Sequence, residues 1–261
     1  MTDIIARSAE DWFGIKADPD DIIKLEEYLW KTYGGADSDI LDKVFSSGEA
    51  AGFLTVNETY FFREFAHFSL LRSILPAYEK SGIKICSAAV ASGCEAYSIA
   101  MIIEAYNKSL EKPLPYHIDA FDINPKVIET ADKGIYNTRA LREDGRCFWY
   151  LADQYLKKIT DGYRVEPALK NNITFFIHNL MKELPGKGYD IIFFRNAFIY
   201  FSRQNRDRIL SNLSLSLKDG GTLIMGVSET AGVNHGDFEL INRNDVFYFK
   251  KSAGNASKSV C

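Results

Sequence analysis

Residues Ile83–Ser98, IKICSAAVASGCEAYS, pass from a short apolar run through small residues into the start of a helical pattern. Ile83–Ser87 predicts a strand, and Glu95–Tyr106 carries apolar residues at helical spacing. Small residues between a strand and a helix let a ligand approach the backbone, and the first helical turn offers unpaired N–H groups. In open α/β sheets, ligands bind beyond the carboxyl ends of the strands. We therefore expect a ligand site on this loop.

Strands and helices alternate from this stretch to residue 227. The predicted further strands are His117–Ile123, Thr174–His178, Tyr189–Arg195 and Thr222–Val227, and the predicted helices are Asn124–Lys133 and Arg206–Leu217. Phe238–Ile241 and Val246–Lys250 predict a terminal hairpin. This order predicts an α/β fold with a mostly parallel, doubly wound, Rossmann-like sheet. The loop after the first strand does not match G-x-G-x-x-G, which argues against a dinucleotide dehydrogenase.

Residues 1–54 predict a separate helical segment. Helices are expected at Asp20–Lys31, with Asp18 or Asp20 as the cap, and at Ser38–Phe45. The segment holds twelve acidic residues and five basic ones. It is therefore strongly acidic, although such charge usually marks only a solvated face.

The main domain is expected at residues 55–251. It begins with a linker in which Asn57 or Thr59 caps a helix carrying Phe61, Phe62, Phe65 and Phe68. Arg142–Lys158 predicts a helix and Gly162–Glu166 a strand, so a small inserted subdomain is expected at about 143–172. The small, polar residues 252–261 predict a disordered tail.

The composition bounds the class of protein. It is 46% hydrophobic and 25% charged, as in ordinary soluble globular proteins, and the net charge of −4 argues against a nucleic-acid partner. We expect no membrane insertion, because the sequence has neither a transmembrane run nor a signal peptide. The cysteines and histidines show no metal-ligand spacing, so we expect no metal and free thiols in a reducing compartment. The expected state is a cytoplasmic monomer.

Five ordered blocks carry a more specific signal. They are NETYFFRE at Asn57–Glu64, SAAVASGCEAYS at Ser87–Ser98, FDIN at Phe121–Asn124, HNL at His178–Leu180 and FRNAFIYF at Phe194–Phe201. They resemble N-x-T-x-F-F-R-E, S-A-A-x-S-x-G-E-E-P-Y-S, S-D-I-D, N-L and C-R-N-V-M-I-Y-F of the CheR-type chemotaxis receptor methyltransferase family. The resemblance implies a Rossmann-like class I SAM-dependent methyltransferase with a small N-terminal helical segment and an inserted small β-containing subdomain.

That family transfers a methyl group from S-adenosyl-L-methionine (SAM) to a glutamate of a chemoreceptor's helical region, giving a methyl ester and S-adenosylhomocysteine. By this resemblance, Glu95 is an acidic ligand of the cofactor and Asp122 meets its ribose hydroxyls. Tyr200 matches the tyrosine beside the transferable methyl group. The other implied cofactor-binding residues are Asn57, Thr59, Arg63, Asn179, Leu180, Asn196 and Ala197.

The chemistry suits these residue types. A carboxylate acceptor has an ordinary pKa of about 4.3 and is already ionised at neutral pH, so no general base is needed. Alignment of the reactants then supplies the main effect, roughly 7–11 kcal/mol at best. Arg63 and Tyr200 are the predicted catalytic residues. Arg63 would hold the acceptor carboxylate or that of the cofactor, and Tyr200 would orient the acceptor or face the sulfonium.

Two departures from the family pattern leave alternatives open. Cys94 and Ala96 replace a glutamate and a proline of G-E-E-P-Y, which should weaken the start of the helix modestly. The family presents a basic N-terminal helix to an acidic receptor region, whereas residues 1–54 are acidic here and would repel it. The alternatives are a CheR-like methyltransferase with a different acceptor and a non-catalytic SAM-binding signalling module.

Overall fold

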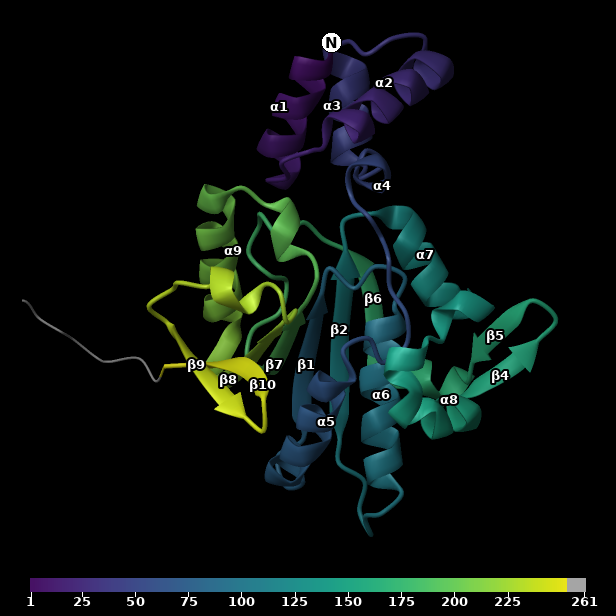
Figure 1. Ribbon diagram of the computed structural model, residues 1–261, viewed down its shortest axis with the longest axis vertical. Helices are drawn as coiled ribbons and strands as arrows, with labels where there is room; N and C mark the ends of the chain where they lie inside the picture. Colours follow the sequence, from purple (N-terminus) through teal and green to yellow (C-terminus); the bar gives the residue numbers. More distant parts are fainter. Residues whose placement is uncertain (253–261) are drawn as a thin grey trace, which may run out of the picture.

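A seven-stranded sheet forms the centre of the computed structural model, which describes residues 1–252. Apart from Ser252, the tail predicted to be disordered lies outside these residues. The strands are β1 (Ile83–Ala88), β2 (Tyr116–Asp122), β6 (Ile173–Ile177), β7 (Tyr189–Phe194), β8 (Leu217–Met225), β9 (Phe238–Arg243) and β10 (Val246–Lys251). Figure 1 shows the sheet between helices on both faces.

The strand order β6-β2-β1-β7-β8-β10-β9 confirms the doubly wound prediction. Pairs from β6 to β8 are parallel, and β10 pairs antiparallel with both β8 and β9. Numbered within this sheet, the order reads 3-2-1-4-5-7-6. The chain reverses direction across the sheet between β1 and β7, which is where open α/β sheets bind ligands.

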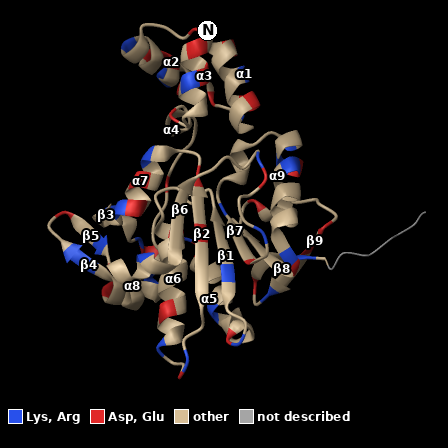
Figure 2. Ribbon diagram, turned by 180° about the vertical axis from the view of Figure 1, so that it is seen from behind, with Lys and Arg blue, Asp and Glu red and all other residues tan. Residues whose placement is uncertain are grey.

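The central strands are mostly apolar on both faces because both faces are covered. Ile191 and Phe193 of β7 pack in one cluster with α5 (Phe65–Ile74) and α6 (Cys94–Asn107). Ile192 and Phe194 pack in the other with α9 (Arg203–Ser216) and the N-terminal helices. Figure 2 accordingly shows the central strands almost free of charged residues. The helices of this domain are α5 (Phe65–Ile74), α6 (Cys94–Asn107), α7 (Pro125–Lys133), α8 (Trp149–Tyr155) and α9 (Arg203–Ser216).

The N-terminal segment is a small helical unit beyond the carboxyl ends of the parallel strands (Figure 1). It contains α1 (Thr2–Phe13), α2 (Pro19–Tyr33), α3 (Ser38–Ser46) and α4 (Ala51–Leu54), of which α2 and α3 match predicted helices. Asp18 caps α2 through the amide of Asp20, and Asp37 caps α3. A β-bridge between Ile15 and Phe201 joins the unit to the sheet domain.

The prediction for the linker is wrong in one respect. Phe61 and Phe62 precede the helix, which begins only at Phe65 after Glu64 in a left-handed conformation. The amide of Phe62 donates to the Ser98 hydroxyl at 3.0 Å, and both phenylalanines are fully buried. Their burial against α6 and the inserted region outweighs the local helical pattern, so neither Asn57 nor Thr59 is a helix cap.

The inserted region is more β-rich than the sequence predicts. It forms a second sheet, β3-β5-β4, from β3 (Ile135–Asn137), β4 (Leu156–Ile159) and β5 (Gly162–Val165). The predicted helix at 142–158 is only partly correct, because 3-10 turns at Glu143–Phe148 precede α8 and β4 replaces its end. β3 lies before residue 143, so the small sheet starts earlier than the predicted insert.

One smaller difference concerns strand β8. β8 starts at Leu217, earlier than the predicted strand Thr222–Val227, with a register shift opposite β7. The remaining 3-10 helices are Leu75–Tyr78, Thr138–Ala140, Pro167–Asn172, Phe198–Tyr200 and Thr230–Gly232. Among residues 1–252, no helix combines the length and apolar character needed to span a bilayer.

Candidate active site

A cavity opens at the carboxyl ends of β1, β2 and β7, roofed by the N-terminal unit and the linker. Its volume is about 910 Å³, including the part open to solvent. Every residue that the sequence singles out for catalysis or cofactor binding lines it. These residues are Asn57, Thr59, Arg63, Glu95, Asp122, Asn179, Leu180, Asn196, Ala197 and Tyr200.

Asp122 fixes the loop that follows β1. Its Oδ2 accepts from the amide of Ala91 and its Oδ1 from the amide of Asn124, each at 3.0 Å. Burial raises the pKa of this carboxyl above its ordinary value, against the backbone N–H groups that favour the ionised form. A buried carboxylate at this strand end can accept hydrogen bonds from the hydroxyls of a ligand.

Gly93 and Cys94 form the entry to α6. Gly93 has a φ of +90°, and a Cβ there would lie 2.7 Å from Cβ of Ala131, so only glycine fits. Cys94 is buried, and burial raises the pKa of its thiol to about 12. The thiol is therefore neutral and acts as a small apolar group. The Ser98 hydroxyl donates to the Cys94 carbonyl at 2.7 Å, which supports the first turn of α6.

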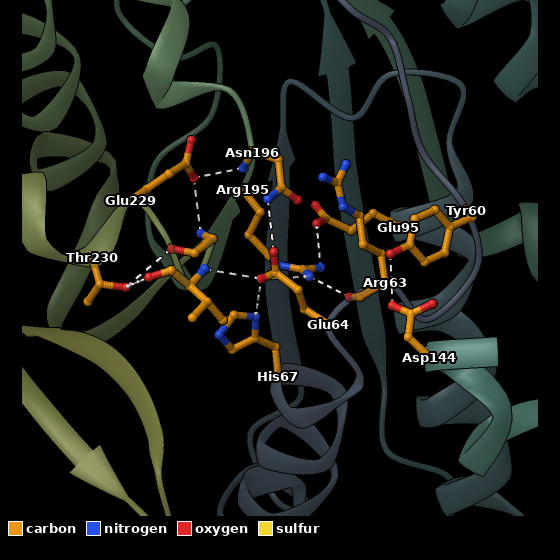
Figure 3. Close-up of polar contacts among 12 residues, drawn as sticks. Tyr60, Arg63, Glu64, His67, Glu95, Asp144, Arg195, Asn196, Glu229 and Thr230 are labelled. Atoms are coloured by element: carbon orange, nitrogen blue, oxygen red, sulfur yellow. Dashed lines mark hydrogen bonds and ion pairs between the residues drawn. The ribbon is translucent and has the colours of Figure 1, made fainter. Parts of the chain in front are cut away.

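Glu95 belongs to a chain of ionic groups, shown in Figure 3, in which two half-buried carboxylates flank the buried Arg195. Its Oε1 accepts from the Ser87 hydroxyl at 2.6 Å, and its Oε2 lies 3.0 Å from Nη1 of Arg195. Nη2 of Arg195 lies 3.3 Å from Oε2 of Glu64. Burial opposes ionisation of Glu64, but His67, Arg195 and Asn196 together hold its pKa well below the ordinary value. The Glu64 carboxylate is therefore charged in this arrangement.

Asn196, at the end of β7, is held in a left-handed conformation with a φ of +58°. Its Nδ2 donates to Oε1 of Glu64 at 2.9 Å, and its amide donates to Oε2 of Glu229 at 2.7 Å. Glu229 also accepts from the amides of Phe198 and Gly226, and its burial raises the pKa of its carboxyl. This strained turn places Asn196 and Ala197 on the cavity wall.

Asn179 connects the sheet domain to the N-terminal unit. Its Nδ2 donates to the Trp12 carbonyl at 2.6 Å, and its Oδ1 accepts from the Met181 amide at 2.9 Å. The amide of Lys16 donates to the Tyr200 carbonyl at 2.8 Å on the other side of the cavity. Residues on the cavity wall therefore hold the N-terminal unit in place.

The two predicted catalytic residues lie on the linker side. The half-buried Tyr200 donates its hydroxyl to the Val56 carbonyl at 3.2 Å. Nη1 of Arg63 donates to the Glu58 carbonyl at 2.8 Å, and its guanidinium lies 5.7 Å from the ring centre of Tyr60. Arg63 retains guanidinium N–H groups that can bind a carboxylate.

Several residues at the site are not among those predicted from the sequence. Arg195 stands within the quoted block FRNAFIYF, and Glu64 ends NETYFFRE, so motif position was the available signal for both. Phe13 and Ile15 of the N-terminal unit and His178 also line the cavity. No sequence signal identifies Phe13 and Ile15, because only the packing of a distant segment brings them there.

The cavity suits SAM. Carboxylates in the first turn of α6 and at the end of β2 match its ammonium and ribose hydroxyl donors, and the small residues Ala89 and Ala91 leave room for the ligand. SAM has no phosphate, which fits the lack of a glycine-rich phosphate loop. In the part of the chain that the structure describes, no group of three or more His, Cys, Asp or Glu side chains could hold a metal ion. The strand order and this site define a class I SAM-dependent methyltransferase.

Comparison with known proteins gives the family. Residues 57–247 match the family "CheR methyltransferase, SAM binding domain". The chain is 36% identical to a chemotaxis protein methyltransferase of Vibrio parahaemolyticus over 208 residues, covering 76% of this chain and 73% of that protein. It is 31% identical to one of Listeria monocytogenes over 206 residues, covering 77% and 76%. The protein belongs to the CheR methyltransferase family.

Solved structures show more distant likeness. Magnesium protoporphyrin IX methyltransferase of Synechocystis with bound SAM aligns with 89% of this chain and 97% of its own, at 12% identity and a TM-score of 0.40. The plantazolicin methyltransferase in complex with S-adenosylhomocysteine aligns with 81% and 62%, at 15% identity and a TM-score of 0.38. The strand order, rather than these likenesses, defines the fold class.

Proposed function

We propose that this protein transfers the methyl group of SAM to a glutamate carboxylate of a partner protein, giving a glutamate methyl ester and S-adenosylhomocysteine. The observation that carries the proposal is that Arg63 and Tyr200 line the same cavity as Glu95 and Asp122. An acceptor side chain at Arg63 and Tyr200 would therefore meet the methyl donor. The name shared by the relatives, chemotaxis protein methyltransferase, supports a protein acceptor of the chemoreceptor kind.

SAM supplies a methyl carbon bonded to a positively charged sulfur. An oxygen of the acceptor carboxylate forms a bond to that carbon while the carbon–sulfur bond breaks and its electron pair stays on sulfur. No proton moves, because the carboxylate attacks in its ionised form. The protein then has to bind both reactants, align them and exclude water.

Each predicted residue has a role in this proposal. Glu95 accepts from the ammonium group of SAM and Asp122 from its ribose hydroxyls. Asn57, Thr59, Asn179, Leu180, Asn196 and Ala197 complete the cofactor wall. Arg63 holds a carboxylate, either of the acceptor or of the cofactor, by charge-assisted hydrogen bonds. Tyr200 orients the acceptor oxygen or faces the sulfonium with its ring.

Transfer of label from tritiated SAM to chemoreceptor cytoplasmic fragments tests the proposal. We expect label that alkali releases as methanol, because methyl esters hydrolyse in base. Arg63→Ala and Tyr200→Phe should lower incorporation more than they lower SAM binding. Base-stable label would contradict ester formation, and SAM binding without transfer to any acceptor offered would favour a non-catalytic signalling module.

A different protein acceptor is the second candidate, favoured by the charge of the N-terminal unit. Its twelve acidic and five basic residues would repel an acidic receptor helix. Transfer to glutamates in basic but not acidic fragments would support it. For either acceptor, the proposal includes action as a monomer in the cytoplasm, which light scattering and cell fractionation can check.

A further inference from the structure

Arg195 is a buried cation between two carboxylates. Its side chain is 2% exposed, with Nη1 3.0 Å from Oε2 of Glu95 and Nη2 3.3 Å from Oε2 of Glu64. Nη2 also donates to the carbonyl of Arg63, and the guanidinium lies 5.5 Å from the ring centre of Phe68. Figure 3 shows the guanidinium between the two acids. These contacts fix the position of the Arg195 guanidinium.

Each carboxylate is held on its other side by neutral donors. Glu95 accepts from the hydroxyl of Ser87, and Glu64 accepts from the side chain of Asn196 and from the amide of Val227. These contacts join β1, α6, the start of α5 and the turn after β7. Glu95, Arg195 and Asn196 all line the cavity, so the chain of contacts reaches the ligand site.

Two carboxylates that share a buried site cannot both ionise without a countercharge, and the pKa of one rises strongly. Arg195 touches both and supplies that charge. Burial lowers the pKa of His67, whose Nδ1 lies 3.3 Å from Glu64, so this ring is neutral at pH 7. The other titratable or charged groups around the chain of contacts are Arg63, Cys86, Asp122 and Glu229.

We propose that Arg195 is a positioning residue for SAM: it keeps Glu64 and Glu95 ionised together and aims Glu95 at the ammonium group of the cofactor. The inference rests on the proposed contact between Glu95 and that ammonium. Glu64, Glu95 and Arg195 with a neutral His67 carry one net negative charge. SAM, with an ammonium, a sulfonium and a carboxylate, carries one net positive charge, so the buried set complements it.

The test is the pH dependence of S-adenosylhomocysteine binding, measured by calorimetry between pH 6 and 8.5. This ligand keeps the ammonium group. We expect the dissociation constant of the wild type to change by less than about twofold, because both carboxylates stay charged. In Arg195→Met, Glu95 should take up a proton, because Glu64 keeps two neutral donors, Asn196 and the Val227 amide, and Glu95 keeps only Ser87. Binding should then weaken about tenfold per pH unit below the raised pKa of Glu95. Arg208→Met, the same change on the exposed face of α9, should behave like the wild type.

A double variant separates charge balance from packing. Glu64→Gln in the Arg195→Met background removes the competing carboxylate, so Glu95 should ionise again and binding should lose its pH dependence. Arg195→Lys retains the charge and should fold and bind independently of pH even if Arg195→Met does not fold. Binding by Arg195→Met that does not vary with pH, a pH-dependent double variant or a pH-dependent Arg195→Lys would each overturn the proposal.

Glu95→Gln distinguishes this inference from the assignment beneath it. Wild-type affinity of Glu95→Gln at every pH would show that Glu95 does not contact the ammonium group. If Glu95→Gln binds weakly and Arg195→Met binds independently of pH, then Glu95 does contact the ammonium group. Only the proposed role of Arg195 would then be wrong.

Discussion

Asp122 uses both carboxylate oxygens to anchor loops while it lines the cavity. We expect Asp122→Ala to weaken S-adenosylhomocysteine binding by roughly 10- to 100-fold, about 1.4–2.8 kcal/mol, because a buried acceptor and a loop anchor are lost. Calorimetry measures this directly. Asp207→Ala on exposed α9 should bind like the wild type. If Asp122→Ala bound S-adenosylhomocysteine as tightly as the wild type, Asp122 would not be a ligand of the cofactor.

His67 should make stability depend on pH. Burial lowers its pKa below the ordinary 6.5, so below that pH the unfolded chain binds a proton that the folded protein does not. The free energy of unfolding should therefore fall by up to ~1.4 kcal/mol per pH unit below about pH 6.5, down to the lowered pKa. Glu64 contributes in another window, since its lowered pKa stabilises the fold above about pH 4.3 and this contribution is lost only at lower pH.

Urea denaturation at pH 7.5 and 5.5 checks this. His67→Gln should show a smaller loss of stability between the two pH values than the wild type. His117→Gln, which removes an imidazole 3.0 Å from Asp119 with a 45% exposed side chain, is the control for the change of residue type and should not reduce the loss. An equal loss in His67→Gln and the wild type would contradict the role of His67.

Two asparagines connect helix α1 to the sheet domain. Asn179 donates to the Trp12 carbonyl and lines the cavity, whereas Asn205 donates to the Glu10 carboxylate and the Gly14 carbonyl outside it. We expect Asn179→Ala and Asn205→Ala both to speed hydrogen exchange in α1, because each loses a contact that holds the helix. Only Asn179→Ala should also weaken S-adenosylhomocysteine binding. If the two variants bound S-adenosylhomocysteine equally well, Asn179 would have no role in cofactor binding beyond holding α1.

Charge is divided unevenly along the chain. Residues 1–54 carry a net charge of −7, from twelve acidic and five basic residues, whereas the full chain carries −4. With an acidic receptor fragment as acceptor, kcat/KM should rise with ionic strength between about 50 and 300 mM, because salt screens the repulsion. Glu27→Gln with Asp39→Asn, both on exposed positions of the N-terminal unit, should reduce this salt dependence. A rate that falls with salt would show attraction between the unit and the acceptor.

The order of strands and helices was largely predictable because each local pattern agrees with its environment. Tyr189–Phe194 is apolar except for Asp190, as expected of a strand covered on both faces, and Asn124 with Pro125 marks the start of α7. Prediction failed where distant packing outweighs local pattern. Phe61 and Phe62 are spaced from Phe65 and Phe68 as on one side of a helix, yet both precede α5 and are buried in the core against α6 and the insert.

The amino-acid sequence alone determined the family, the cofactor and most of the polar residues of the cavity wall. Most of these residues follow strand ends, and Asn57, Thr59 and Arg63 lie in the linker before α5, each within a motif of the family. Only the folded chain brings Arg195 between Glu64 and Glu95, with 100 positions separating it from Glu95, and seats Phe13 and Ile15 over the cavity. Ionic contacts depend on distance and burial, neither of which a motif specifies. The stretch Ile83–Ser98 thus predicted where the ligand site lies, and the tertiary packing around it placed the charged groups Glu64, Glu95 and Arg195 together.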